Sequence, residues 1–166
     1  MSDKEQTAPI RIGQGYDIHP FKEGRPLVLG GISFDTPYGL DGHSDADVLT
    51  HAICDALLGA AGLPDIGHYF PNTDPNYRNI DSQELLKEVA SSISNEGYFI
   101  GNIDATLITE KPKIAAKTDA MKHRLARSAG ISPSQIGIKA TTNEGLGSIG
   151  RGEGAAALAT SLIYIK

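Results

Sequence analysis

The stretch Tyr98-Phe-Ile-Gly-Asn-Ile-Asp-Ala-Thr-Leu-Ile-Thr109 decides the fold class, because it predicts one long strand between two helices. Ile103, Ala105 and Leu107 alternate with the residues between them, as expected of a strand with one buried face. Before it, Asp81 and Glu84 open a predicted helix that runs to about residue 95. After it, a further helix is predicted over about 113–129, closed by Gly130.

Further from this strand, the same alternation of strands and helices continues. Strands are predicted over 10–19, 26–34, 136–141 and 155–165. A helix is predicted to start at Ser44, where Ser44 and Asp47 form a capping box before an apolar stripe ending at Gly62. The turn-rich residues 70–79 are not expected to be regular. The pattern predicts a single α+β domain over residues 10–166, a mixed β-sheet with helices packed on one face, preceded by a disordered polar tail over residues 1–9.

Composition narrows the class of protein. The chain has 166 residues, a net charge of −5 and 40% hydrophobic residues, which suits one soluble domain and disfavours nucleic-acid binding. No apolar run approaches the ~20 residues of a membrane span, and the first residues do not resemble a signal peptide. We therefore expect a cytoplasmic protein. The single Cys54 excludes an intrachain disulfide and is interpreted as a small buried hydrophobe, with a nucleophile as the alternative.

Three residues suggest a metal site. Asp17 and His19 are two positions apart, so on a strand both project from one face. His51 lies on the next predicted helix, on a face shared with Asp47 and Asp55, which would place Asp47 beneath it. Two histidines and one carboxylate leave a fourth tetrahedral position open, as a working Zn²⁺ ion requires.

Other stretches have side chains suited to phosphate. His43 and Ser44 lie at the predicted start of a helix, whose N-terminus favours an anion, the alternative being a plain capping box with an incidental histidine. The turn Lys111-Pro112-Lys113 offers backbone groups and cations, although a solvated loop is the alternative. The segment 140–145 carries two threonines and Glu144, which suit diphosphate and a hard cation, the alternative being a polar turn.

The segment Gly150-Arg151-Gly152-Glu153-Gly154 alternates glycine with charge. In an extended conformation Arg151 and Glu153 would share a face. Such a loop makes sense where chains meet near a symmetry axis.

These segments, in this order over residues 10–166, resemble the 2-C-methyl-D-erythritol 2,4-cyclodiphosphate synthase family of the non-mevalonate isoprenoid pathway. The matching motifs are Gly15-Tyr-Asp-Ile-His19, Gly42-His-Ser-Asp-Ala-Asp-Val-Leu-Thr-His51, Asp65-Ile-Gly67 with Phe70-Pro-Asn-Thr-Asp74, Lys111-Pro-Lys113, Lys139-Ala-Thr-Thr-Asn-Glu144 and Gly150-Arg-Gly-Glu-Gly154.

The resemblance implies a homotrimeric lyase with active sites between subunits, which releases CMP from 4-diphosphocytidyl-2-C-methyl-D-erythritol 2-phosphate. It implies Zn²⁺ on Asp17, His19 and His51, and Mg²⁺ or Mn²⁺ near Glu144. His43 and Thr142 match the family's transition-state positions.

The resemblance also implies a substrate-binding set drawn from two neighbouring subunits. Asp17, His19, His43, Ser44, Asp65, Ile66, Gly67, Phe70, Pro71, Asn72, Thr73 and Asp74 would contact the phosphates and methylerythritol. Thr109, Glu110, Lys111, Pro112, Lys113, Ile114, Ala115 and Thr141 would hold the cytidine end, with Thr142, Asn143, Glu144, Ser148 and Arg151 completing the set.

The chain departs from the family pattern at Tyr16, often phenylalanine, and at Ser148, where relatives can carry an aromatic residue. Both departures concern a possible site on the three-fold axis of the trimer, which would bind an anion or an isoprenoid diphosphate. Two alternatives for the function are a metal-dependent phosphohydrolase and a trimeric nucleotide-binding regulator with a ferredoxin-like fold. The second explains the glycine-rich loop but leaves the histidines and Asp17 without a role.

Overall fold

The long strand predicted from the sequence forms β5 (Tyr98–Ile108) in the computed structural model of the chain, which describes residues 9–71 and 73–166. The other strands are β1 (Ile10–Glu23), β2 (Leu27–Leu29), β3 (Ile32–Phe34), β4 (Tyr38–Leu40), β6 (Ile136–Thr141) and β7 (Gly154–Ile165). The helices are α1 (Val48–Ala61), α2 (Ile66–Tyr69), α3 (Ser82–Asn95), α4 (Thr118–Ala129) and α5 (Gly147–Gly150), with 3-10 turns at Pro75–Tyr77, Ala115–Lys117 and Pro133–Gln135.

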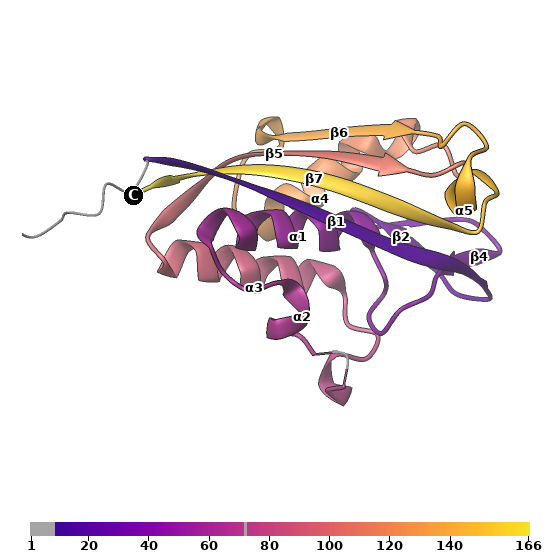
Figure 1. Cartoon of the computed structure of the whole chain (residues 1–166), viewed down its shortest axis with the longest axis horizontal. Coiled ribbons are helices and arrows are strands. Elements are labelled where there is room, and N and C mark those ends of the chain that lie inside the picture. The colour runs from indigo at the N-terminus through magenta and orange to yellow at the C-terminus, as the bar shows by residue number, and fades with distance from the viewer. Residues whose placement is uncertain (1–8, 72) are drawn as a thin grey trace, which may run out of the picture.

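Five strands form one mixed sheet in the order β4-β1-β7-β5-β6, and β2 pairs separately with β3. The pairs β1–β4, β1–β7 and β5–β7 are antiparallel, whereas β5–β6 is parallel. The helices α1, α3 and α4 lie together on one face of this sheet (Figure 1). The predicted α+β domain with a mixed sheet and helices on one face is therefore confirmed.

The core lies between the sheet and these helices. Leu49, Ile53 and Leu57 of α1 have no exposed surface, which confirms the predicted apolar stripe. Strand β1 comes unusually close to α1 at two glycines: a Cβ on Gly13 or Gly15 would lie 2.0 Å from a backbone oxygen of α1. This close approach brings side chains of β1 within reach of side chains on α1.

The opposite face of the sheet carries large apolar side chains that the single chain leaves exposed. On β1, Ile10, Ile12, Tyr16 and Ile18 are 44–70% exposed, and Leu158 of β7 is 39% exposed. An exposed apolar patch of this kind often marks a protein–protein interface.

The predicted strand over 26–34 is wrong, because the chain turns at Gly30 and Gly31. Both glycines have positive φ angles, 57° and 72°, so the segment folds back as the hairpin of β2 and β3. This conformation suits glycine, which has no Cβ to clash.

The predicted helix start at Ser44 is also wrong. Helix α1 begins at Val48, and Asp47 is its N-cap, whose side chain accepts a hydrogen bond from the Thr50 backbone N–H. Asp47 is fully buried and also accepts hydrogen bonds from the N–H groups of Gly30 and Gly31, 2.9 and 2.7 Å away. It therefore anchors the hairpin and does not lie beneath His51 in an open site.

Three further boundaries differ from the prediction. Strand β1 continues to Glu23, four residues beyond its predicted end. Helix α4 begins at Thr118, because residues 115–117 form a 3-10 turn. The segment 147–150 forms the short helix α5, so Arg151 and Glu153 lie in a turn and not in an extended strand.

At the N-terminal end, the carbonyl of Pro9 accepts a hydrogen bond from the Ile165 N–H, 3.2 Å away. Residues 1–8 of the predicted tail lie outside the described residues. Among the helices of residues 9–71 and 73–166, none has the length and hydropathy needed to cross a membrane.

Candidate active site

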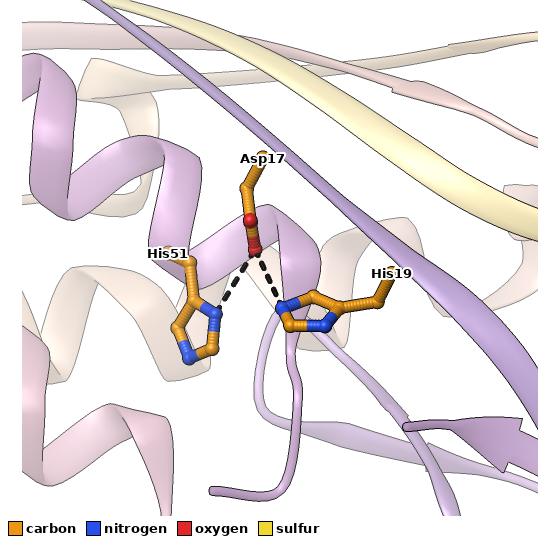
Figure 2. A group of neighbouring side chains, drawn as sticks. All are labelled: Asp17, His19 and His51. Carbon is orange, nitrogen blue, oxygen red and sulfur yellow. Dashed lines mark hydrogen bonds and ion pairs between the residues drawn. The ribbon is translucent and has the colours of Figure 1, made fainter. Parts of the chain in front are cut away.

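Three side chains with metal-binding atoms converge between β1 and α1. Asp17 and His19 project from one face of β1, and His51 comes from the first turn of α1 (Figure 2). The Oδ2 atom of Asp17 lies 3.0 Å from His19 Nε2 and 3.0 Å from His51 Nδ1. One ligand atom from each residue lies within 4.8 Å of the other two, so the three predicted residues form a group that could hold a metal ion.

The ring of His19 is held by the segment that follows β4. Its Nδ1 lies 2.8 Å from the carbonyl oxygen of Asp41, which can only accept, so Nδ1 carries the hydrogen. Nε2, 3.0 Å from Asp17 Oδ2, is then the nitrogen that a bound metal ion would use. Gly42 lies against the same ring, because a Cβ at Gly42 would be 3.0 Å from His19 Cε1. This arrangement is the usual support of a metal-binding histidine.

The ring of His51 is held from the opposite side. Its Nε2 lies 2.9 Å from Ser82 Oγ and 3.2 Å from Ser44 Oγ. With Nε2 facing these hydroxyls, Nδ1 faces Asp17.

The charges of the three residues are coupled. Burial favours the neutral form of Asp17, but hydrogen bonds from His19 and His51 outweigh it and hold the pKa of Asp17 well below its usual range. Burial also disfavours the charged form of His19, but the hydrogen bond and charge of Asp17 outweigh it and raise the pKa of His19. Asp17 therefore stays ionised and stabilises positive charge on His19. A bound cation would supply that charge.

The donor set fits a Zn²⁺ ion. Two imidazole nitrogens and one carboxylate oxygen form a common three-residue set for catalytic zinc, which keeps a fourth position for a ligand. The three side chains are each 13–24% exposed and line an open hollow, so a substrate oxygen can reach that position.

This metal-side hollow has a volume of about 420 Å³ and gathers several predicted substrate residues. His43 and Ser44 line it beside the metal group, and Ile66, Gly67 and Phe70 line it as well. The remaining lining residues are Asp17, His19, Gly42, His51, Tyr77, Ile80 and Leu85.

The predicted placement of His43 and Ser44 at a helix N-terminus is wrong, since both precede α1 by several residues and Asp47 caps it. His43 instead lies near the segment predicted to wrap the substrate: its Nε2 is 3.1 Å from the carbonyl oxygen of Asp74. Its proximity to a substrate anion would therefore come from the loop fold and not from a helix dipole.

Asp65, Pro71 and Thr73, which were also predicted to wrap the substrate, do not line the metal-side hollow. Asp65 caps α2 by accepting a hydrogen bond from the His68 N–H, 3.1 Å away. Pro71 and Thr73 are exposed. Asn72 lies outside the described residues.

A second hollow, of about 380 Å³, collects residues predicted to hold cytidine. Its lining includes Thr109, Pro112, Lys113, Ile114, Ala115, Thr141 and Thr142. It shares no lining residue with the metal-side hollow. Strands β7 and β5 separate β1 from β6, which is roughly 14 Å across the sheet. One chain therefore does not bring the two groups of predicted residues together.

Glu144 lies next to this second hollow, in the turn after β6. The Thr142 hydroxyl donates to Glu144 Oε1 at 3.0 Å, and Glu144 has a positive φ of 51°. The Asn143 N–H donates to Glu110 Oε1 at 2.9 Å. The turn therefore presents an exposed carboxylate and a hydroxyl side by side.

A third hollow lies near the glycine-rich loop, lined by Glu110, Lys111 and Arg151 among others. Arg151 pairs with Glu153 at 2.7 Å, which raises the pKa of Arg151 and lowers that of Glu153. Ser148 is exposed on α5.

Cys54 has no exposed surface, and burial raises the pKa of its thiol well above the usual value. A buried, protonated thiol supports the interpretation as a small hydrophobe and argues against a nucleophile.

Two residues support the site through contacts that the sequence analysis did not predict. Arg25 donates to the carbonyl oxygens of Gly42 and Ser44, 3.0 and 2.7 Å away, and so holds the loop that carries His43. Asp55 accepts from the Ile66 N–H at 2.8 Å and fixes the start of α2. These contacts join residues far apart in sequence, so no local spacing predicts them.

Comparison with known proteins gives a consistent result. The model of the YgbB family matches residues 10–164. The chain is 58% identical to the 2-C-methyl-D-erythritol 2,4-cyclodiphosphate synthase of Synechococcus elongatus, over 93% of this chain and 96% of that protein. It is 35% identical to the CDP complex of IspF from Plasmodium falciparum, with a TM-score of 0.84 over 96% of this chain and 99% of the other.

The chain also matches the bifunctional IspDF of Campylobacter jejuni, with 41% identity and a TM-score of 0.91, but spans only 42% of that longer chain and 95% of its own length. By sequence and by fold, this chain belongs to the YgbB family, in which the relatives it resembles are 2-C-methyl-D-erythritol 2,4-cyclodiphosphate synthases.

Proposed function

We propose that this chain converts 4-diphosphocytidyl-2-C-methyl-D-erythritol 2-phosphate to 2-C-methyl-D-erythritol 2,4-cyclodiphosphate and CMP, as an enzyme of isoprenoid precursor biosynthesis. The observation that carries the proposal is the Asp17–His19–His51 group at the wall of a hollow lined by further predicted substrate residues. The names of the relatives supply the reaction.

The chemistry needs positioning more than a protein base. An oxygen of the substrate's 2-phosphate attacks the β-phosphorus, the bond from that phosphorus to the bridging oxygen breaks, and its electron pair leaves with CMP. A phosphate monoester has a second pKa near ~6, so the attacking group is already largely dianionic at neutral pH. The barrier is therefore the approach of one anion to another in the correct line.

The residues of the candidate site suit this need to bring two anionic groups together in line. Asp17, His19 and His51 would hold Zn²⁺, which when bound polarises a phosphate oxygen as a Lewis acid. Glu144 would hold Mg²⁺ or Mn²⁺, a hard cation that takes oxygen ligands from carboxylate and phosphate. His43 and Thr142 would donate hydrogen bonds to phosphate oxygens as charge moves to the leaving group.

We further propose that the active site is completed by a neighbouring subunit in a homotrimer. Two observations support this: the metal-side hollow and the second hollow share no residue, and the outer face of the sheet is apolar and exposed. A subunit packed on that face would bury Ile12 and Tyr16 and could bring its second hollow to the metal group.

Mixed trimers test this arrangement. When a His19→Ala chain is coexpressed with a Lys113→Ala chain, about a quarter of subunit junctions should combine an intact metal group with an intact cytidine side. Activity should then exceed that of either variant alone, and sedimentation should give three times the mass of one chain. Activity no better than the single variants would argue for a site within one chain.

Arg151 is proposed to lie near the three-fold axis, where three copies would form a basic ring. Its pairing with Glu153 offsets part of the charge. The remaining positive charge could bind an anion or the head group of an isoprenoid diphosphate.

We also propose that residues 10–166 form the catalytic domain and that residues 1–9 are dispensable for it. The enzyme is proposed to be cytoplasmic and to act without nucleic acid or membrane.

The reaction is tested by incubating the zinc- and magnesium-loaded protein with the cytidine substrate and analysing products by phosphorus NMR. A cyclic diphosphate with CMP in equal amounts supports the proposal. Open-chain monophosphates would instead indicate the metal-dependent phosphohydrolase, in which water replaces the 2-phosphate as nucleophile.

A further inference from the structure

The ring nitrogen of His51 that faces away from the metal group contacts a buried serine. Nε2 lies 2.9 Å from Ser82 Oγ, and Ser82 has no exposed surface. Ser82 is the first residue of α3, so this contact joins α3 to α1 at the metal site. Either atom could supply the hydrogen, and the direction of this bond decides which nitrogen of His51 has a free lone pair.

The direction is fixed by Asp45. Its two carboxylate oxygens both face Ser82: Oδ2 accepts from the Ser82 backbone N–H at 3.1 Å, and Oδ1 accepts from the Ser82 hydroxyl. An ionised carboxylate can only accept, so the single hydroxyl hydrogen of Ser82 is committed to Asp45. Ser82 Oγ must then accept from His51 Nε2–H, so when an ion is bound beside Asp17 it is Nδ1, 3.0 Å from Asp17 Oδ2, whose lone pair can bind that ion.

Asp45 is itself firmly held. Its backbone N–H donates to the Ile80 carbonyl at 3.1 Å, and its Oδ1 accepts from the Asp47 N–H at 3.2 Å. The carboxylate therefore cannot easily turn away from Ser82.

The other hydroxyl near His51 does not fix the ring in this way. Ser44 Oγ is 3.2 Å from Nε2 and accepts from the Ala46 N–H at 3.1 Å. No carboxylate takes the hydrogen of Ser44 in the contacts of the described residues, so this hydroxyl can donate or accept. The Ser44 hydroxyl can therefore adapt to either tautomer of His51 and does not determine which one forms.

We propose that Asp45 and Ser82 are positioning residues that hold His51 with its hydrogen on Nε2 and so present Nδ1 as the metal ligand. The proposal rests on the proposed zinc site. A ligating histidine must offer a bare nitrogen in a fixed direction, and loss of such outer partners typically lowers metal affinity by about 10–100-fold. Neither Asp45 nor Ser82 would touch the substrate or the ion.

The proposal is tested with two measurements on each purified variant. The first is zinc affinity, by competition with a fluorescent chelator. The second is the nitrogen NMR spectrum of the His51 ring in the zinc-loaded protein, which reports which nitrogen carries the hydrogen and which binds the ion. This second readout does not depend on activity.

Ser82→Ala removes the acceptor, so zinc affinity should fall about 10–100-fold and the His51 spectrum should show a mixture of the two tautomers. Ser82→Thr keeps the hydroxyl and should restore both. Ser91→Ala is the matched control, because Ser91 is an exposed serine on the same helix; it should behave as wild type.

Asp45→Asn provides an independent variant if Ser82→Ala does not fold. An amide in place of the carboxylate can donate to Ser82 Oγ, which frees the Ser82 hydrogen to point at His51 Nε2. The hydrogen of His51 should then move to Nδ1, and zinc affinity should fall while the thermal unfolding midpoint changes little.

A folded Ser82→Ala or Asp45→Asn protein with wild-type zinc affinity and an unchanged His51 spectrum would overturn the proposal. Failure of the zinc site itself is distinguishable, because wild-type protein would then bind no zinc at all, whereas failure of this proposal alone leaves wild type and variants with the same measurable zinc affinity.

Discussion

The contact between β1 and α1 predicts a specific sensitivity at Gly15. An alanine Cβ at this position would lie 2.0 Å from the Ala52 carbonyl oxygen and 2.7 Å from the Ala56 nitrogen. Both neighbours are backbone atoms, so no side chain can rotate away. To reach even 3.0 Å, strand and helix must separate by about 1 Å, and overpacking of this kind costs about 1–3 kcal/mol or more.

We expect Gly15→Ala to lie at the upper end of that range, near 3 kcal/mol, which lowers the thermal unfolding midpoint by about 6–12 °C for a domain of this size. The same separation reaches the metal group, since Asp17 follows Gly15 by two residues and His51 lies on α1. Metal–ligand distances tolerate only about 0.2 Å of change, so zinc affinity of the folded variant should fall by more than about tenfold.

The assay pairs calorimetry of the metal-free protein with zinc titration well below the unfolding midpoint. Gly59→Ala is the matched control, because a Cβ there would lie 3.8 Å from its nearest neighbour on an exposed position of α1. That change should stabilise the protein by about 0.5–1 kcal/mol, as alanine does in place of glycine within a helix. A Gly15→Ala variant with wild-type midpoint and zinc affinity would refute the argument that this glycine sets the distance between β1 and α1.

Four further outcomes follow from the site. His51→Ala should remove tightly bound zinc and most activity while the fold persists, since two ligands hold the ion poorly; zinc retained at one ion per chain, by elemental analysis, would contradict this. Glu144→Gln should raise the magnesium concentration needed for half-maximal activity without lowering zinc content, because an amide is the poorer ligand for a hard cation; loss of zinc with unchanged magnesium dependence would mean that the two metals are assigned the wrong way round. Zinc affinity should fall as the pH drops through the raised pKa of His19, because the protonated ring cannot bind metal, by about tenfold per pH unit for each proton displaced; an affinity that is flat between about pH 5.5 and 8 would argue against histidine ligands. Pyrophosphate should bind the wild-type protein and bind Arg151→Ala more weakly, as followed by calorimetric titration; much tighter binding of farnesyl diphosphate that is insensitive to Arg151→Ala would show that the lipid tail, not the Arg151 charge, drives binding.

The sequence by itself predicted most of the elements and named the three residues that form a group able to hold a metal ion. Strand alternation in residues 98–109 and the apolar stripe of α1 are local patterns with periods of two and 3.6 residues, so they need no tertiary context. Asp17 and His19 were predictable as a pair for the same reason, since a strand places alternate residues on one face. The resemblance then joined His51 and Glu144 to one reaction.

Tertiary structure decided how these residues meet. Helix α1 starts after Asp47, whose carboxylate accepts hydrogen bonds from Gly30 and Gly31 of the hairpin as well as from the helix. Sequence rules for helix caps consider only neighbouring residues, so they do not include partners from a distant hairpin. The tautomer of His51 depends on Ser82 and Asp45. Ser82 is 31 residues from His51 in the sequence and Asp45 is six residues from it, and the three become neighbours only when α3 packs on the loop before α1. Local patterns record the period of one element, whereas hydrogen-bond direction and ligand distance are set by the contacts of several elements at once, and those exist only in the folded chain.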